Sequence, residues 1–382
     1  MNHDWEEFRR EMPVAQKWAY FDHAAVAPLS QPARNAIERW LAQATEEGDT
    51  VWPEWSKQVE RTRRNFALAL GARPEEIAFI PNTTTGIGLV AEGFRWNAGD
   101  NIVTLENEFP SNMYPWLNLQ RRDVETRMAP VEPDGRVDMK KLLATCDEHT
   151  RIIAISWVGY ASGWRVNLNE IVDLAHRRGI LVFVDAIQGL GVFPLDVAKT
   201  KVDFLAADGH KWLLGPEGAG VLYIRREHLE RLDPLMIGWN SVMQQQDFSR
   251  IELTLRGEAA RYEGGSQNMA GVAALGASAE MLIRYGWGKS ISAIGQRVML
   301  VTDSACLQLE HLGAKIITNR DGDHRSGIVL FELPGKDPQA VRRHCLQNNV
   351  ALSCRAGRLR IAAHAYNDLQ DLDRLIEALR SA

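Results

Sequence analysis

Short apolar runs, rich in β-branched residues and spaced along the first part of the chain, most strongly limit the folds open to it. They are Asn101–Leu105, Ile152–Trp157, Ile180–Asp185, Val202–Ala206 and Gly220–Ile224. Helix-like stretches follow two of them, around Trp116 and at Leu168–Arg178. Apolar strands joined by helix-length connections are typical of a mostly parallel sheet covered on both faces. The pattern therefore predicts an α/β domain that binds its ligand at the carboxyl ends of the strands.

The pattern changes near Gly271, where a long helical stretch begins that runs through Leu309. Short strands and helices then follow at Lys315–Ile317, Gly327–Glu332, Pro338–Asn348, Leu359–Ala362 and Leu369–Leu379. This mixture predicts a smaller α+β domain. We expect an N-terminal arm over residues 1–20, a large domain over 21–264, and a long linking helix with the small domain over 265–382.

Composition bears mainly on partners and location. The chain of 382 residues has a net charge of −5 and scattered lysines and arginines, which argues against nucleic acid and anionic membrane as partners. A small molecule is the expected partner, and no metal site is expected. The first residues are charged and no apolar run approaches the roughly 18 residues of a membrane span, so we expect a cytoplasmic protein. The four cysteines show no CxxC spacing and are expected to be reduced.

Two polar residues end neighbouring apolar runs. Asp185 closes Val182–Asp185, and Lys211 follows the next run, 26 residues further on (211 − 185). One crossover of this length places an acid and a lysine in one cleft. This pairing suits pyridoxal 5′-phosphate (PLP), because the acid keeps the pyridine nitrogen protonated while the lysine binds the cofactor and moves protons. Alone, each residue would more often be a surface lysine and a turn cap.

The motifs from Phe21–Pro28 to Tyr366–Asn367 occur in the order typical of one family, and nearly the whole chain resembles it. The chain resembles the class V aminotransferases among the fold-type I PLP-dependent enzymes, which include cysteine desulfurases, selenocysteine lyases and isopenicillin N epimerase-like proteins. The resemblance implies the fold-type I architecture. It also implies that Lys211 forms the Schiff base, Asp185 pairs with the pyridine nitrogen and Gln188 donates to the phenolic oxygen.

Other motifs of the resemblance concern the phosphate of the cofactor. His210 is expected beside it, and Thr83 and Thr84 would hold it at the start of a helix, where backbone N–H groups and the helix dipole favour an anion. A plain helix cap would explain the threonines equally well in isolation. Arg261–Asn268 resembles the segment that reaches across a homodimer, so Ser266 is expected to touch the partner's phosphate.

The substrate end of the site is expected at the C-terminal motif Leu359–Asn367. There the resemblance implies that Arg360 holds a substrate carboxylate through its bidentate fork. Arg355 and His23 are the further residues expected to contact the substrate. Tyr160 is expected to contact the cofactor near its phenolic oxygen and to influence substrate choice.

The chain departs from the cysteine desulfurase pattern at several positions. Phe109 stands where those enzymes have a histidine over the cofactor ring, and phenylalanine can stack but cannot transfer protons. Cys354 lies in a compressed loop, which favours a structural thiol over a mobile nucleophile. Asp208 stands where a serine is usual near the phosphate, and Tyr160 where an asparagine is usual. We expect Asp208 to turn toward a basic or N–H partner, because a carboxylate beside a dianion is repelled.

Three functions stay open at this point. The first is a PLP-dependent enzyme acting at the α-carbon of an amino acid, as a transaminase or as a lyase or epimerase. The second is a desulfurase or selenocysteine lyase. The third is a PLP-binding protein without activity. The substrate amino acid is not given by the sequence.

Overall fold

The structure is a computed structural model in which residues 4–382 are described. Its main element is a seven-stranded sheet in the order β2-β8-β7-β6-β5-β3-β4. All neighbouring pairs are parallel except those of β8, which runs antiparallel to β7 and β2. The strands are β2 (Ile77–Ile80), β3 (Asn101–Leu105), β4 (Glu125–Ala129), β5 (Thr150–Ser156), β6 (Leu181–Asp185), β7 (Phe204–Asp208) and β8 (Gly220–Ile224). The predicted mostly parallel sheet is confirmed.

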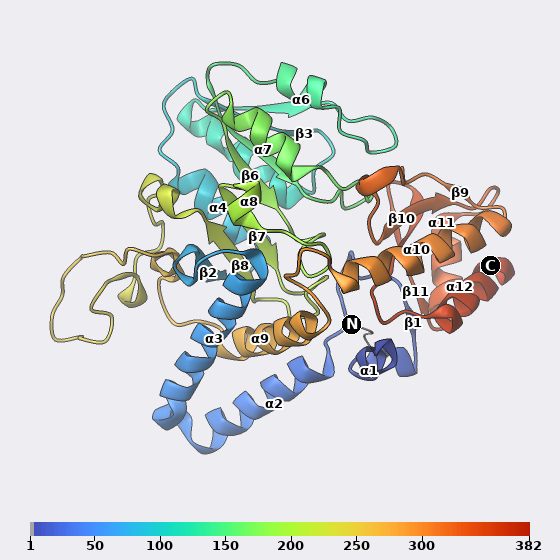
Figure 1. Cartoon of the computed structure of the whole chain (residues 1–382), viewed down its shortest axis with the longest axis horizontal. Helices are drawn as coiled ribbons and strands as arrows, with labels where there is room; N and C mark the ends of the chain where they lie inside the picture. The colour runs from blue at the N-terminus through green and yellow to red at the C-terminus, as the bar shows by residue number, and fades with distance from the viewer. Residues whose placement is uncertain (1–3) are drawn as a thin grey trace.

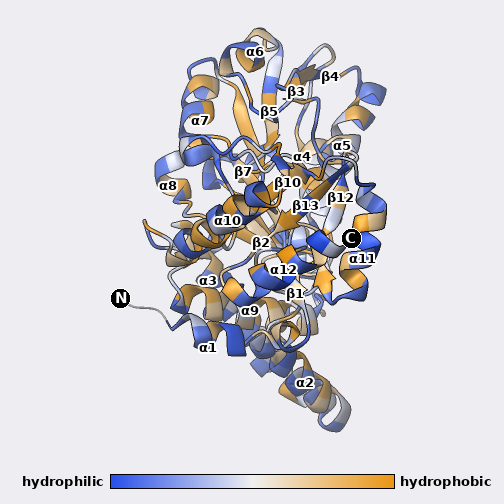
Figure 2. Cartoon of the chain, turned by 90° about the vertical axis from the view of Figure 1, so that its right-hand side faces the viewer, coloured by the Kyte–Doolittle hydropathy of each residue, from blue (hydrophilic) through white to orange (hydrophobic). Residues whose placement is uncertain are grey.

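Both faces of this sheet are buried, as the continuous apolar runs predicted. In β5, Ile153 and Ile155 belong to one core, and Ile152 and Ala154 belong to the core on the opposite face, because side chains alternate along a strand. Helices α3, α7, α8 and α9 contribute to the first core, and α4 and α5 to the second. Figure 2 shows the orange apolar strands enclosed by helices with mixed colouring. The sheet therefore forms the middle layer of the large domain.

The helices of this part of the chain have the following bounds. They are α2 (Gln31–Glu46), α3 (Trp52–Leu70), α4 (Thr83–Gly93), α5 (Tyr114–Leu117), α6 (Met139–Ala144), α7 (Leu168–His176), α8 (Val197–Thr200) and α9 (Met269–Arg284). Helices α2 and α3 meet at a turn that projects from the body of the molecule and diverge from there, and α9 lies against both (Figure 1).

The long helical stretch expected from Gly271 to Leu309 is two helices rather than one. Helix α9 ends at Arg284, and α10 (Ala293–His311) begins nine residues later. Gly286 and Gly288 lie between them with φ of 93° and 84°. These left-handed conformations are open mainly to glycine and cannot continue a right-handed helix. The chain therefore turns here and enters the small domain through α10.

The small domain is built on an antiparallel sheet in the order β12-β13-β10-β9, covered by helices (Figure 1). Its elements are α10, β9 (Lys315–Ile316), β10 (Ile328–Glu332), α11 (Pro338–Gln347), β11 (Val350–Ala351), β12 (Ser353–Arg355), β13 (Arg358–Ala362) and α12 (Leu369–Ser381). The N-terminal arm packs here too: α1 (Trp5–Arg10) places Arg9 2.6 Å from Asp371, and β1 (Ala19–Tyr20) pairs in parallel with β11. The two ends of the chain are thus joined in one α+β unit.

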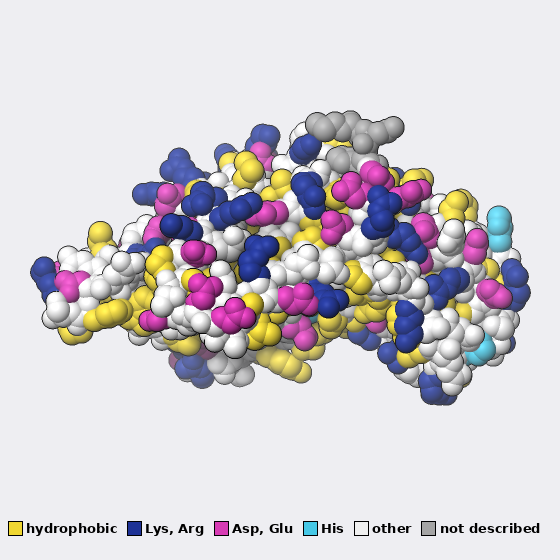
Figure 3. Space-filling model, turned by 90° about the horizontal axis from the view of Figure 1, so that it is seen from below, with side chains coloured by type: hydrophobic (Ala, Val, Ile, Leu, Met, Phe, Trp, Pro, Cys, Tyr) yellow, Lys and Arg dark blue, Asp and Glu magenta, His cyan; other side chains and the backbone are white. Residues whose placement is uncertain are grey.

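The surface agrees with the absence of a basic stripe in the sequence. Figure 3 shows lysine and arginine side chains mixed with aspartate and glutamate over the face in view. Among the described residues, no helix combines the length and apolar character needed to cross a membrane.

Candidate functional site

A pocket of about 300 Å³ lies at the carboxyl ends of β5, β6 and β7, where the small domain meets the large one. The predicted site residues gather there, with the exceptions of His23 and Ser266. The residues confirmed to line it are Thr83, Thr84, Phe109, Tyr160, Asp185, Gln188, His210, Lys211, Arg355 and Arg360. Residues far apart in the sequence therefore form one cavity, as the motifs predicted.

Lys211 lies in a tight turn directly after β7. Its side chain is buried, and its backbone carbonyl accepts a hydrogen bond of 3.1 Å from the N–H of Leu214. Leu214 adopts a left-handed φ of 55°, which is strained for a bulky residue. Burial lowers the pKa of the Lys211 ammonium to about 8, against the opposing effect of the nearby Asp185 carboxylate. A larger fraction of this amine is therefore neutral near neutral pH than in an ordinary lysine.

Asp185 ends β6 and faces the same cavity. Its carboxylate accepts a hydrogen bond of 3.1 Å from the N–H of Ile187, and its side chain is buried. Burial raises the pKa of Asp185 to about 6, while that hydrogen bond and the charge of Lys211 act in the opposite direction. A carboxylate in such a place is stabilised by any cation that enters the pocket.

Phe109 forms one wall of the cavity. The Nζ atom of Lys211 lies 5.5 Å from the centre of the Phe109 ring, and the Tyr160 ring meets Phe109 edge to face at 5.2 Å. The Phe109 side chain is 41% exposed, so one face of its ring is free to stack on a planar ligand.

The start of α4 supplies the hydroxyl end of the pocket. Asn82 caps this helix of 11 residues by accepting a hydrogen bond of 2.9 Å from the N–H of Thr85. The hydroxyl of Thr83 accepts a hydrogen bond of 2.9 Å from the N–H of Asp208, and that of Thr84 donates to Ser111 at 2.9 Å. The helix cap is compatible with the predicted phosphate site, since the positive end of the helix dipole and two hydroxyls face one space.

Asp208 behaves as predicted for a carboxylate near an anion site. One of its oxygens accepts a hydrogen bond of 2.7 Å from the N–H of Gly209, and the other lies 2.9 Å from Nδ1 of His210. The carboxylate is therefore turned toward the Gly209 N–H and the His210 ring.

Arg360 forms the opposite wall, in the middle of β13. Its buried guanidinium donates to the Tyr160 carbonyl at 2.6 Å and to the Ser353 hydroxyl at 3.1 Å, and it lies 3.2 Å from the carboxylate of Asp22. Burial lowers the pKa of Arg360 to about 10, with Asp22 opposing this effect. The sequence did not reveal that Asp22 pairs with this arginine, because the two residues are 338 positions apart and follow no shared motif.

His23 does not lie where a role in this pocket would need it, so the prediction for His23 requires correction. The fully buried His23 ring lies 2.8 Å from both the Ala362 carbonyl and the Tyr366 hydroxyl, so neither nitrogen is available to a substrate. Ser266 is exposed and lines a separate hollow beside Trp239. Ser266 cannot reach this pocket of its own chain.

Gln188 lines the pocket, but its amide is engaged elsewhere. The nitrogen donates to the Ala24 carbonyl at 3.0 Å, and the oxygen accepts from the Trp212 indole at 2.7 Å. Donation to a cofactor oxygen would require the amide nitrogen to share or leave its contact with Ala24.

The thiol of Cys354 points away from the pocket. Neighbouring side chains of β12 alternate, so Ser353 and Arg355 face the pocket while Sγ of Cys354 lies 3.2 Å from the Pro338 carbonyl, at the start of α11. Burial raises the pKa of this thiol, which disfavours the thiolate. This position agrees with the structural role expected for Cys354.

Sequence reasoning missed one buried pair beside the pocket. Glu108 accepts a hydrogen bond of 2.6 Å from the N–H of Ser156 and a second from its hydroxyl, and Ser156 lines the pocket opposite Asp185 in the sheet. Burial raises the pKa of Glu108 to about 7. The sequence shows a glutamate directly before Phe109, but this alone does not predict its contact with Ser156.

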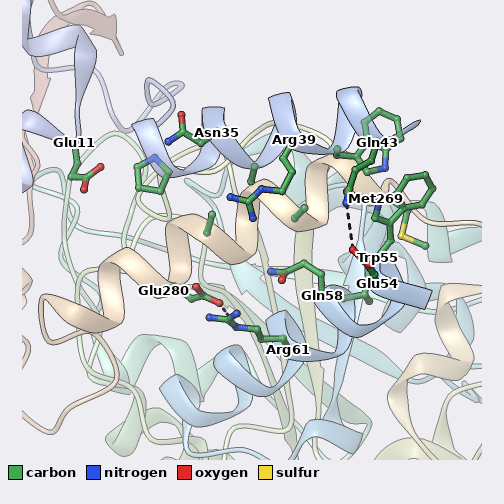
Figure 4. Close-up of a pocket in the computed structure, with 16 residues that line it drawn as sticks. Glu11, Asn35, Arg39, Gln43, Glu54, Trp55, Gln58, Arg61, Met269 and Glu280 are labelled. Atoms are coloured by element: carbon green, nitrogen blue, oxygen red, sulfur yellow. Dashed lines mark hydrogen bonds and ion pairs between the residues drawn. The ribbon is translucent and has the colours of Figure 1, made fainter. Parts of the chain in front are cut away.

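A larger groove of about 440 Å³ lies between α2, α3 and α9 (Figure 4). Its charged side chains include Arg61, which lies 2.7 Å from Glu280, and Glu54, which accepts a hydrogen bond of 3.4 Å from Gln43. No lysine lines it, and its lining shares no residue with the pocket of Lys211. The smaller pocket is therefore the better candidate for the active site.

Comparison with known proteins decides the family. Residues 19–375 match the sequence profile of the family described as Aminotransferase class-V. The chain belongs to this family. A protein of Methanothermobacter thermautotrophicus described as a probable cysteine desulfurase is 30% identical over 98% of the chain and 97% of that protein. A cysteine desulfurase of Escherichia coli is 31% identical over 98% of the chain and 97% of its own length.

Solved structures show the same fold. The apo structure of a cysteine desulfurase from Thermococcus onnurineus has a TM-score of 0.89 at 24% identity, covering 100% of the chain and 98% of its own. A mutant of the protein C-DES, described with glycine covalently linked to its PLP cofactor, has a TM-score of 0.91 at 23% identity and covers 99% of both chains. The predicted fold-type I architecture is confirmed, and the chain is a PLP-dependent enzyme of the class V family.

The residues of the pocket fit this cofactor. PLP is a planar ring with an aldehyde, a basic nitrogen and a phosphate. The pocket offers a buried amine for the aldehyde, a buried acid for the nitrogen and hydroxyls at a helix start for the phosphate. It also offers the exposed face of Phe109 for the ring.

Proposed function

We propose that the chain removes the proton from the α-carbon of an amino acid, with PLP held on Lys211. The observation that carries this proposal is the buried Lys211 amine, which shares a pocket with the Asp185 carboxylate and an arginine suited to a substrate carboxylate. When bound, PLP would supply an electron sink for the electron pair left at the α-carbon.

Each residue has a defined task in this proposal. Asp185 would keep the pyridine nitrogen protonated, and Thr83, Thr84 and His210 would hold the phosphate. Arg360 would hold the substrate carboxylate. Phe109 would stack on the ring, and Tyr160, which meets it edge to face, would limit the space left for the substrate.

Lys211 would carry the proton transfers. A base must be neutral to accept a proton, and the lowered pKa of Lys211 increases its neutral fraction. Phe109 has no ionisable group, so no second base lies over the ring at this position. Delivery of the proton to the cofactor carbon that carried the aldehyde would give a transaminase. Return of the proton to the α-carbon would give an epimerase, and loss of a β-substituent would give a lyase.

A second candidate within this chemistry is release of sulfur from cysteine or a related amino acid. The descriptions of the relatives as cysteine desulfurases favour it. We propose that such a reaction would proceed without a thiol of the chain as nucleophile, because Cys354 faces α11 and the remaining cysteines do not line the pocket.

The experiment that tests these proposals uses the cofactor-loaded protein. It is incubated with L-cysteine, and sulfide, pyruvate and alanine are measured; a parallel series uses other amino acids with and without a keto acid. Sulfide with pyruvate would support elimination, and a new amino acid formed from the keto acid would support transamination. If no amino acid in a broad panel changes the visible spectrum of the bound cofactor, the protein binds PLP without acting on amino acids, and the proposal fails.

We also propose that the protein is a homodimer in which Ser266 reaches the partner's phosphate site. Ser266 is exposed and outside its own pocket, which leaves it free for another chain. Apolar side chains are exposed in the segment just before it, among them Met236, Met243, Phe248 and Ile251, and such patches are typical of interfaces. A Ser266→Ala variant should retain the cofactor less well. A monomer by light scattering that is fully loaded with cofactor would contradict the dimer.

A cytoplasmic location is likewise proposed. It is supported by the four cysteines, all of which are free thiols, as is usual in a reducing compartment.

A further inference from the structure

The two arginines of the pocket differ in how many hydrogen bonds and ion pairs their guanidinium groups already form within the chain. Arg360 is buried, donates hydrogen bonds from all three of its nitrogen atoms, and has the carboxylate of Asp22 3.2 Å from Nη2. Its charge is therefore partly compensated before any substrate binds. One arginine in this state suits one carboxylate that shares the guanidinium with Asp22.

The charge of Arg355, by contrast, is not compensated by a carboxylate of the described residues. Its side chain is half-buried and lines the pocket, and it donates a hydrogen bond of 2.7 Å to the carbonyl of Cys354. No carboxylate within residues 4–382 forms an ion pair with it. The positive charge of Arg355 nevertheless acts on the pocket, because it contributes to lowering the pKa values of both Arg360 and Lys211.

The backbone holds Arg355 in this place. It is the last residue of β12, and the turn to β13 consists of Ala356 and Gly357, with φ of 47° and 72°. Two left-handed residues in succession form the tight turn that fits the twist of a hairpin. Arg355 is thus fixed at the rim of the pocket that Arg360 also lines, two residues along the sheet from the position opposite Arg360.

The acids that line the pocket are occupied by other groups. Asp208 is bonded to Gly209 and lies beside His210, and Asp185 faces Lys211 and Ile187. Neither is positioned to satisfy Arg355, so an anion reaching that side of the pocket would find a free cation.

We infer that Arg355 binds a second acidic group of the substrate, so that the preferred substrates are small α-amino acids with an anionic side chain, such as a carboxylate or a sulfinate. This inference rests on the proposed function, because it assigns the α-carboxylate to Arg360. A guanidinium can donate two parallel hydrogen bonds to such a group, and an amide of the same shape satisfies it less well.

The test compares L-aspartate with L-asparagine, which differ in one charge, and uses L-alanine as a reference without a polar side chain. L-aspartate, L-asparagine and L-alanine are titrated into the cofactor-loaded protein, and dissociation constants are read from the change in the visible spectrum of the cofactor. The parent should bind aspartate at least about tenfold more tightly than asparagine. Arg355→Gln should bring that ratio close to one and leave alanine binding nearly unchanged, and Arg355→Lys should retain part of the preference.

The matched control is Arg358→Gln. Arg358 lies on the same hairpin, but its charge is paired with Glu332 at 2.6 Å, so this variant should keep the preference for aspartate. Equal binding of aspartate and asparagine to the parent would overturn the inference. So would an equal loss for all three ligands in Arg355→Gln, which would assign the α-carboxylate to Arg355. Failure of every ligand to change the spectrum would instead refute the proposed function, and this inference with it.

Discussion

Replacement of Asp22 by asparagine tests the charge balance on which substrate binding depends. The substitution keeps the shape of the side chain but removes the charge next to Arg360, whose side chain is 1% exposed. A hydrogen bond to a charged group contributes about 1.5–3 kcal/mol. Asp22 is itself 14% exposed, so we expect a loss in this range rather than the larger cost of a fully buried unpaired charge.

This loss in the free energy of unfolding corresponds to a small decrease in Tm. Unfolding entropy of about 2.1 cal/mol/K per residue gives roughly 0.8 kcal/mol/K for a chain of this length, so Asp22→Asn should lower Tm by about 2–4 °C. The same substitution removes an anion that competes for Arg360. A carboxylate ligand should therefore bind the variant more tightly and raise its Tm more than that of the parent.

The assay is thermal unfolding of the cofactor-loaded protein with and without L-alanine. Asp233→Asn is a suitable control, since Asp233 pairs with Arg95 at an exposed site and should contribute little. If Asp22→Asn leaves Tm unchanged and binds L-alanine no better than the parent, Asp22 does not balance the charge of Arg360 and the reasoning is wrong.

Three further predictions concern single residues. Lys211→Ala should abolish the visible absorption of the lysine-bound cofactor and reduce turnover at least about a hundredfold; an unchanged spectrum would show that another lysine binds PLP. Cys354→Ala should leave sulfide release from L-cysteine unchanged. If the parent forms alanine in equal amount to the sulfide and this variant does not, the thiol acts as a nucleophile after all. Burial lowers the pKa of His23 from 6.5 to about 3. The unfolded chain therefore binds more protons between these values, and stability falls with falling pH by up to about 1.4 kcal/mol per unit. His23→Asn should lose less stability than the parent between pH 7 and pH 5, measured by urea unfolding; equal losses would contradict this.

The sequence predicted what depends on local pattern and on order along the chain. Continuous apolar runs gave the strands of the large sheet, and the strand ends gave Asp185 and Lys211. Strand β2 was not predicted, because its four apolar residues, Ile77–Ile80, are too few to tell a strand from part of a buried helix. The reversed direction of β8 was not predicted either, because an apolar run carries no information on direction. The break in the helix after Arg284 was also not predicted. Its cause is the left-handed conformation of two glycines, and the sequence shows only Gly-Trp-Gly at this place.

The site was harder to predict where contacts join distant segments. Arg360 and Asp22 were each part of a recognised motif, yet their pairing depends on how the small domain packs on the large one. His23 was expected at the substrate because Asp22 beside it opens the same segment. In the structure Asp22 faces the pocket arginine and His23 faces the opposite way, into a buried contact with Tyr366. Alternation between neighbouring residues decided this outcome.

The pairing of β1 with β11 has a consequence for how the protein is made. Ala19 pairs with Val350, so β1 has no partner until the 331 residues from Ala19 to Val350 (350 − 19) have been synthesised. At about 5–20 residues per second, that delay is roughly 20–70 s. During this time the large sheet can form, and with it the residues proposed to hold the cofactor, among them Lys211 and Asp185. Arg355 and Arg360 follow only with β12 and β13, so the substrate end of the pocket is completed after the cofactor end.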